Sequence, residues 1–190
     1  MKKNDTSGSS SNAKKNFVTD DGNVYILGSF DETISSDVIP IVVSLISQMS
    51  DLKDPVFNIY INSRGGYADE LFGLLSILDI AKKNGIAVHT HVIGVAYSAG
   101  SLLAAYGDHR TMSRYADHLL HLGSGEASFS TFEQLKREAE NGAKHFNKIL
   151  QIYAEHTKIP QKKLVEMLKD DKLYLDADQC LKFGICDEIV

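Results

Sequence analysis

The fold is decided by the stretch Gly94-Val95-Ala96-Tyr97-Ser98-Ala99-Gly100-Ser101, which joins two apolar runs. Residues 87–93 before it are rich in β-branched side chains and predict a strand, and residues 102–105 after it predict a helix. A serine at such a corner, among small residues, is a recurring way to expose a nucleophile. The tight turn lifts its hydroxyl clear of the sheet, and the following N–H groups point at a developing oxyanion. The pattern A-x-S-x-G is close to G-x-S-x-G, and alone it is also typical of an ordinary turn.

A second turn of the same kind lies earlier in the chain. Residues 55–61 predict a strand that runs directly into Asn62-Ser63-Arg64-Gly65-Gly66. A helix with leucines at helical spacing follows, and Lys83-Asn84-Gly85 ends it. Strand, turn and helix at short intervals indicate βα units around a largely parallel sheet. Two such turns on neighbouring strands would lie at the same sheet edge, where sites of α/β proteins form.

The remaining pattern adds a long helix and a closing unit. Residues 131–157 predict a helix whose apolar residues are sparse in the first half and dense in the second, so we expect it to project or to pack on a partner. Asp176-Ala177-Asp178-Gln179 is a capping signature for a last helix, which Gly184 ends. The other predicted elements are strands at 23–28, 116–122 and 185–190 and helices at 36–49, with Pro40 in its first turn, and at 160–168.

Composition limits the classes of partner and compartment. The chain has 190 residues, 43% hydrophobic content and a net charge of −5, which suits one domain over residues 17–190 and gives no reason to expect nucleic acid. No apolar run approaches the roughly 18 residues of a membrane span, and no secretory signal is recognisable. Cys180 and Cys186 are too few for a disulfide framework, so we expect a cytoplasmic protein. Residues 1–16 are polar and should form a flexible arm.

In their order and spacing these motifs resemble the proteolytic subunit of the Clp protease family, over about residues 23–190. The segment 61–66 looks like the family's I-N-S-P-G-G loop, and Gly94-x-Ala96-x-Ser98-x-Gly100 is similar to the motif around its nucleophile. His121 follows Arg110 at the spacing of the family's catalytic histidine. The helix from Thr131 is similar to the handle helix that joins its two rings, and residues 174–187 look like its closing signature.

The resemblance implies an α/β spiral of ββα units with a protruding helix, a fold shared with the crotonases. It implies that Ser98 is the nucleophile, His121 the general base and Asp171 the acid, with an oxyanion hole from the N–H groups of Gly66 and Ala99. No cofactor or metal is implied. The implied function is the peptidase core of a compartmentalised serine protease, two stacked heptameric rings that cleave unfolded polypeptides and short peptides. A AAA+ unfoldase on another chain, or mixed-ring subunits, would be its partners.

Three departures from the family pattern bear on these roles. Arg64 stands where the family has proline, so we expect a less rigid and charged loop. Leu-Gly follows His121 where the family has Gln-Pro. The family's aspartate position falls on Lys172, so Asp171 becomes the acid only if one residue is inserted. Asp170 therefore stays open as the alternative acid.

Other histidines offer alternative interpretations. His118 could compete with His121, but three residues apart on a strand they face opposite sides, and the family spacing favours His121. His89 and His91 share a strand face and suggest a metal pair, although no third ligand is placed beside them.

Two other functions stay open at this point. A crotonase-type enzyme acting on acyl-coenzyme A would use a glycine-rich oxyanion loop without needing a Ser–His pair. A catalytically weak or inert ring subunit, acting as a scaffold or regulator, would be expected to lose triad residues, whereas this chain retains Ser98 and His121.

Overall fold

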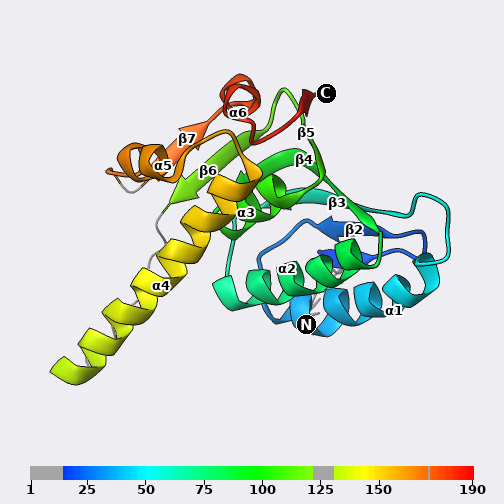
Figure 1. Ribbon diagram of the computed structural model, residues 1–190, viewed down its shortest axis with the longest axis horizontal. Coiled ribbons are helices and arrows are strands. Elements are labelled where there is room, and N and C mark those ends of the chain that lie inside the picture. Colours follow the sequence, from blue (N-terminus) through cyan, green and yellow to red (C-terminus); the bar gives the residue numbers. More distant parts are fainter. Residues whose placement is uncertain (1–14, 122–130, 171) are drawn as a thin grey trace, which may run out of the picture.

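The computed structural model describes residues 15–121, 131–170 and 172–190, which form a mixed sheet with helices packed on it (Figure 1). The predicted α/β class is confirmed, and strand, turn and helix follow one another in the predicted order. The strands are β1 (Asn16–Val18), β2 (Asn23–Ile26), β3 (Val56–Ser63), β4 (Ala87–Tyr97), β5 (His109–Met112), β6 (Asp117–His121), β7 (Lys172–Leu175) and β8 (Glu188–Ile189). The helices are the π-helical turn η1 (Ile34–Val38), α1 (Ile39–Met49), α2 (Ala68–Lys83), α3 (Ala99–Tyr106), α4 (Phe132–His156), α5 (Gln161–Met167) and α6 (Ala177–Phe183).

The strand β4 organises the sheet. The order across the sheet is β1-β2-β3-β4-β5-β8, and β6 and β7 continue from β4 on a separate branch. Residues 89–92 of β4 pair with β5, whereas residues 95–97 pair with β6. The sheet therefore divides at the end of β4, immediately before Ser98. This division brings β6, which carries His121, alongside the serine.

The direction of the strands agrees with the predicted, largely parallel sheet. The pairs β2–β3, β3–β4, β4–β5, β4–β6 and β5–β8 are parallel. Two outer strands, β1 and β7, are antiparallel to β2 and β6. These short antiparallel strands are features that the sequence pattern does not predict.

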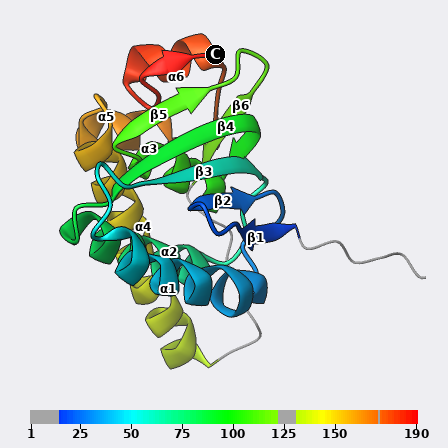
Figure 2. The same cartoon turned by 90° about the vertical axis from the view of Figure 1, so that its right-hand side faces the viewer.

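The core lies between the sheet and the helices α1 and α2, which pack side by side (Figure 2). Alternate residues of β3 (Phe57, Ile59 and Ile61) are fully buried, as are leucines of α2 at helical spacing. Period 2 along a strand and period 3.6 along a helix bring these side chains to facing surfaces. Full burial of each such side chain contributes roughly 1.5–3 kcal/mol. The layer of α1 and α2 thereby holds β3 and β4, the two strands that precede the predicted turns.

The helix α4 projects from the rest of the chain, as predicted (Figure 1). Leu150 and Tyr153 near its C-terminal end are buried, whereas residues 139–145 are exposed. A capping box at Thr131 begins α4. The predicted capping box at Asp176 begins α6, and Gly184 ends it. Neither α4 nor any other helix among the described residues is long and apolar enough to cross a membrane.

Element boundaries near the two turns differ from those predicted. β4 continues to Tyr97, beyond the predicted end at residue 93, because its last residues pair with β6. β3 continues to Ser63 through a pairing with Ala96. The helix α3 consequently begins at once, at Ala99. Of the expected arm, residues 1–14 lie outside the described residues, and Asn16 is buried in β1.

Arg110 joins the C-terminal segment to the body of the protein. Its guanidinium donates two hydrogen bonds to the Asp187 carboxylate, from Nε at 2.9 Å and from Nη2 at 2.6 Å. Nη1 donates a third hydrogen bond, to the carbonyl oxygen of His156. Such bidentate pairs are among the stronger hydrogen bonds of proteins. The hydrogen bonds from Arg110 hold the pKa of Asp187 below its usual range. Arg110 thus connects β5, the end of α4 and the segment that leads to β8.

We predict that Asp187→Asn lowers stability at pH 7 by about 1 kcal/mol, a value reduced by the partial exposure of the carboxylate. A carboxyl whose pKa is depressed in the folded state stabilises above its unfolded pKa and loses this contribution as pH falls through the folded pKa. The difference in melting temperature between parent and variant should therefore shrink below about pH 4. Asp51→Asn, in an exposed turn, is the control. A difference that does not change with pH would contradict the prediction.

Candidate active site

The two predicted turns interlock at the ends of β3 and β4. A bulge follows Ile61 in β3, and the Asn62 side chain accepts the N–H of Val95 at 3.1 Å. A side chain at Gly94 would collide with this amide, since its Cβ would lie 2.5 Å from Asn62 Oδ1. The two sequence motifs therefore fit together as a pair, which explains why both need small residues at these places.

Closer to the serine, the fit between the turns is tighter. A Cβ at Gly65 would lie 2.6 Å from the Cβ of Ser98, and one at Gly100 would lie 3.1 Å from the carbonyl oxygen of Ser63. Real Cβ atoms essentially never lie closer than 3.0 Å to such neighbouring atoms. The backbone of one turn is thus packed directly against the serine of the other.

Ser98 has a strained backbone. Its φ of 54° and ψ of −119° lie outside the regions that side-chain-bearing residues usually adopt. Such strain costs on the order of 1–3 kcal/mol and persists only where the surroundings enforce it. Here the Ser98 N–H donates to Leu119 O of β6 at 2.8 Å, and the Ser98 carbonyl accepts from the Ser101 hydroxyl at 2.6 Å. The turn is the serine corner that the sequence predicts, with Ser98 half-buried.

The glycine loop is held by Phe30. The N–H of Phe30 donates to Gly65 O at 2.9 Å, and its carbonyl accepts from Tyr67 N at 2.7 Å, as in a parallel bridge. In such a bridge the intervening residue, Gly66, directs its own N–H to the opposite side. Gly66 lines the cavity at Ser98. Ala99, the first residue of α3, has an N–H outside the intrahelical ladder and lines the same cavity.

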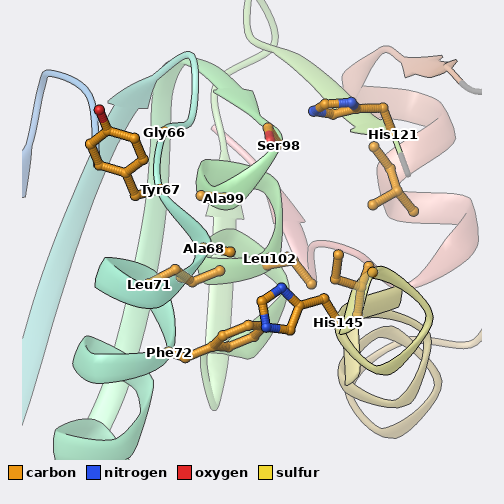
Figure 3. Close-up of a pocket in the computed structure, with 13 residues that line it drawn as sticks. Gly66, Tyr67, Ala68, Leu71, Phe72, Ser98, Ala99, Leu102, His121 and His145 are labelled. Carbon is orange, nitrogen blue, oxygen red and sulfur yellow. The ribbon is translucent and has the colours of Figure 1, made fainter. Parts of the chain in front are cut away.

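The two histidines of β6 face opposite sides, as predicted. His121 lines the cavity, and Figure 3 shows its imidazole extending from β6 toward Ser98. His118 is fully buried and bonds through Nε2 to the Tyr153 hydroxyl at 2.7 Å. Burial lowers the pKa of His118 to about 3, so it is neutral. Of the two, His121 is the histidine that the structure brings together with the serine.

Ser98, Ala99, Gly66 and His121 therefore meet at one cavity of about 350 Å³ (Figure 3). The rest of its lining is mostly apolar, with one further histidine, and comes from α2 and the residue before it, α3, α4 and β6: Tyr67, Ala68, Leu71, Phe72, Leu102, Leu120, Gly142, His145 and Ile149. The arrangement places a hydroxyl, an imidazole and two backbone N–H groups beside a pocket that can accept an apolar side chain.

The sequence pattern does not predict that α4 contributes to this cavity. Gly142, His145 and Ile149 lie on a helix predicted to project or to pack on a partner, and its role as a cavity wall depends on how it crosses α3. His145 meets the ring of Phe72 edge-on, with centroids 5.9 Å apart. No local signal in the sequence marks these residues, because nothing near them has the pattern of a site.

The predicted acid, Asp171, lies outside the described residues, so its role stays a prediction. The register of β6 and β7 pairs His121 with Lys172, the chain neighbour of Asp171. The alternative acid, Asp170, is exposed. Arg64 is also exposed, with its guanidinium 5.8 Å from the Tyr97 ring centroid.

The histidines of β4 lie away from this cavity and have other contacts. His91 stacks on Tyr60 and bonds to Thr111 Oγ1 at 2.9 Å, and His89 meets the edge of His109. Within the described residues no group of three or more potential ligands is arranged to hold a metal ion.

Comparison with known proteins agrees with the geometry. A model of the Clp protease family matches residues 6–190. The chain belongs to the Clp protease family. The resemblance drawn from the motifs is thereby confirmed.

Three relatives are similar over most of the chain. The ATP-dependent Clp protease proteolytic subunit of Deinococcus radiodurans is 28% identical over 151 residues, covering 79% of this chain and 72% of that protein. Proteolytic subunit 2 of Chlamydia muridarum is 29% identical over 154 residues, covering 79% of this chain and 72% of that protein. Proteolytic subunit 1 of Nocardia farcinica is 26% identical over 152 residues, covering 79% of this chain and 75% of that protein.

We predict that Gly66→Ala destabilises this Clp protease chain by a few kcal/mol, because the new Cβ would lie 2.2 Å from the backbone oxygen of Phe30. Gly85→Ala is the matched control: it also has a positive φ, at 79°, but nothing lies within 4 Å of its added Cβ. The control should lose about 1 kcal/mol from backbone strain alone. Chemical denaturation at one protein concentration measures both variants. Equal losses would show that the close approach to Phe30 does not constrain the loop.

Proposed function

We propose that this chain is the peptidase core of a Clp-type serine protease, hydrolysing peptide bonds in unfolded polypeptides and short peptides through an acyl-enzyme on Ser98. The observation that carries the proposal is the meeting of Ser98, His121, Gly66 and Ala99 at one cavity. A serine hydroxyl is a weak nucleophile until a neighbouring imidazole accepts its proton. This set of groups supplies both the nucleophile and the base.

In the proposed mechanism, Ser98 Oγ attacks the substrate carbonyl carbon while His121 accepts the hydroxyl proton. The carbonyl oxygen becomes an oxyanion and accepts hydrogen bonds from the N–H groups of Gly66 and Ala99. His121 then donates its proton to the leaving amine, and the C–N bond breaks. Water, deprotonated by His121, hydrolyses the acyl-enzyme and restores the serine. Asp171 holds the imidazole in the tautomer that accepts this proton.

Support for an active enzyme comes from the strain at Ser98. A subunit that only completes a ring or regulates partners has no need of a serine held at a φ of 54° beside a histidine. Residues with backbone strain of this kind cluster at active sites and other functional sites. An inert scaffold or regulator therefore remains the less economical alternative, and a fluorophosphonate probe that leaves the chain unlabelled would favour it.

Assembly and partners follow from family membership and from α4. The relatives are named as proteolytic subunits of ATP-dependent Clp proteases. We propose two stacked heptameric rings in the cytoplasm, joined through the exposed part of α4. A AAA+ unfoldase on a separate chain would deliver folded substrates, and mixed rings with a second subunit are compatible with the same surfaces.

We predict that Ser98→Ala reduces hydrolysis of a fluorogenic short peptide roughly 10⁴-fold or more, because the variant has no nucleophile to form the acyl-enzyme. The fold and the assembly should persist, since alanine is smaller than serine and retains the backbone. Ser47→Ala, on the exposed side of α1, is the control and should cleave like the parent. Cleavage by the Ser98 variant at the parental rate would exclude Ser98 as the nucleophile.

For the acid, we predict that Asp171→Asn lowers kcat by about 10²- to 10⁴-fold, because asparagine cannot stabilise the imidazolium and favours the wrong tautomer. Asp170→Asn, the adjacent carboxylate, should retain nearly all activity. The measurement is the steady-state rate of both variants on the same peptide. The reverse result would assign the role to Asp170, and two active variants would imply a two-residue site or another acid.

A further inference from the structure

The side chain of Asn16 is buried at a place where the sequence predicts the end of a flexible arm. Asn16 opens β1 and is 2% exposed. Its Oδ1 accepts the N–H of Gly28 at 3.1 Å, and its Nδ2 donates to Ser29 O at 2.8 Å and to Thr33 Oγ1 at 2.9 Å. Burying an amide is costly unless it is hydrogen-bonded, and here both donors and the acceptor of the amide are engaged.

These partners fix the orientation of the amide. A backbone N–H only donates, so the atom that faces Gly28 is the oxygen. A backbone carbonyl only accepts, so the atom that faces Ser29 is the nitrogen. Thr33 accepts from the same nitrogen and donates its own hydroxyl proton to Asp31 Oδ1 at 2.5 Å. Asn16 is therefore a donor toward the carbonyl of Ser29.

Two successive peptide groups continue this donation toward the glycine loop. Ser29 C=O and Phe30 N–H belong to one peptide group and point in opposite directions, because a trans peptide is planar and none of the described peptide bonds is cis. The Phe30 N–H donates to Gly65 O at 2.9 Å. Gly65 C=O and Gly66 N–H form the next peptide group, so the Gly66 N–H points away from Phe30. The order of donation is therefore Asn16, the Ser29–Phe30 peptide and the Gly65–Gly66 peptide.

This relay acts on the Gly66 N–H in two ways. A carbonyl that accepts a hydrogen bond polarises the N–H of its own peptide group, so donors aligned in one direction strengthen one another. The relay also fixes position, because Phe30 O accepts the N–H of Tyr67 at 2.7 Å and Gly66 is held between the two bonds to Phe30. A shift of residues 28–30 would thus move Gly66 as well.

We propose that Asn16 is a positioning residue for the oxyanion hole, its side-chain amide donating into the relay that ends at the N–H of Gly66. The inference rests on the proposed peptidase function, in which this N–H binds the oxyanion. Asn16 is absent from the cavity lining, so it acts through Gly66 and not by contact with substrate. The strand β1 is thereby connected to the place where negative charge develops in the reaction.

The test is the kinetics of Asn16→Leu, which keeps a side chain of similar size and removes the donor. We expect kcat for a short peptide to fall about threefold to thirtyfold, less than the roughly 10²- to 10³-fold loss on deleting an oxyanion-hole donor outright. KM should stay within about twofold, because the cavity lining is unchanged. Affinity for a peptide boronate, whose tetrahedral adduct on Ser98 resembles the oxyanion intermediate, should fall by about the same factor as kcat.

Thr33→Val is the matched control, because it removes the other acceptor of the same amide and leaves the relay in place. Its kcat and its boronate affinity should stay within about twofold of the parent. Thermal melting at one protein concentration measures the stability of both variants, and both should melt below the parent. A Thr33→Val variant that loses as much kcat as Asn16→Leu would assign the loss to destabilisation and overturn the inference.

The remaining outcomes separate this inference from the proposed function. A parental kcat in Asn16→Leu, or a loss confined to KM, would overturn the inference alone while a fluorophosphonate still labels Ser98 of the parent. If Asn16→Leu does not fold, Asn16→Ala is measured in the same way, and a parental kcat overturns the inference. A parent that is not labelled at Ser98 overturns the proposed function and this inference with it.

Discussion

The structure depends on the close approach of two backbones, the glycine loop after β3 and the serine corner after β4. Gly65 packs against Ser98 at a distance that no side chain could share. Ser98 has a strained conformation at this approach, which costs on the order of 1–3 kcal/mol. Hydrogen bonds to β6 and within α3 hold it there. The cost is a small part of what the buried layers of the domain supply, so the strain can be kept at the point where chemistry is proposed.

Topology explains why a histidine meets this serine. β4 exchanges β5 for β6 as its partner near its C-terminal end, and the two strands then end at the same edge. His118 and His121 therefore take opposite roles, one facing the core and the other the cavity. The long helix α4 contributes both to the cavity and to the core. Its His145 lines the cavity, and its Tyr153 is hydrogen-bonded to the buried His118. The cavity and the buried hydrogen bond between His118 and Tyr153 are thus consequences of one arrangement of β4, β6 and α4.

Much of this could be predicted from the sequence, because the deciding signals are local. The serine corner, the glycine turn and the capping residue Asp176 each need particular residues within a few positions, and the structure has them where predicted. The short strands β1 and β7 carry too few residues for a periodic pattern and form by pairing with β2 and β6. The cavity wall at His145 and the bond between His118 and Tyr153 arise from helix packing across distant parts of the chain. Such contacts leave no mark on the residues beside them in sequence.

Alkylation by a peptide chloromethyl ketone tests the central claim, the pairing of Ser98 with His121, most directly. The serine adds to the ketone, and the chloromethyl carbon alkylates the imidazole nearest to it, with loss of chloride. The cavity holds two histidines, so peptide mapping by mass spectrometry can tell them apart. The account predicts alkylation of His121, and its loss in Ser98→Ala. Alkylation of His145 in its place, or modification of His121 that persists without Ser98, would contradict the account.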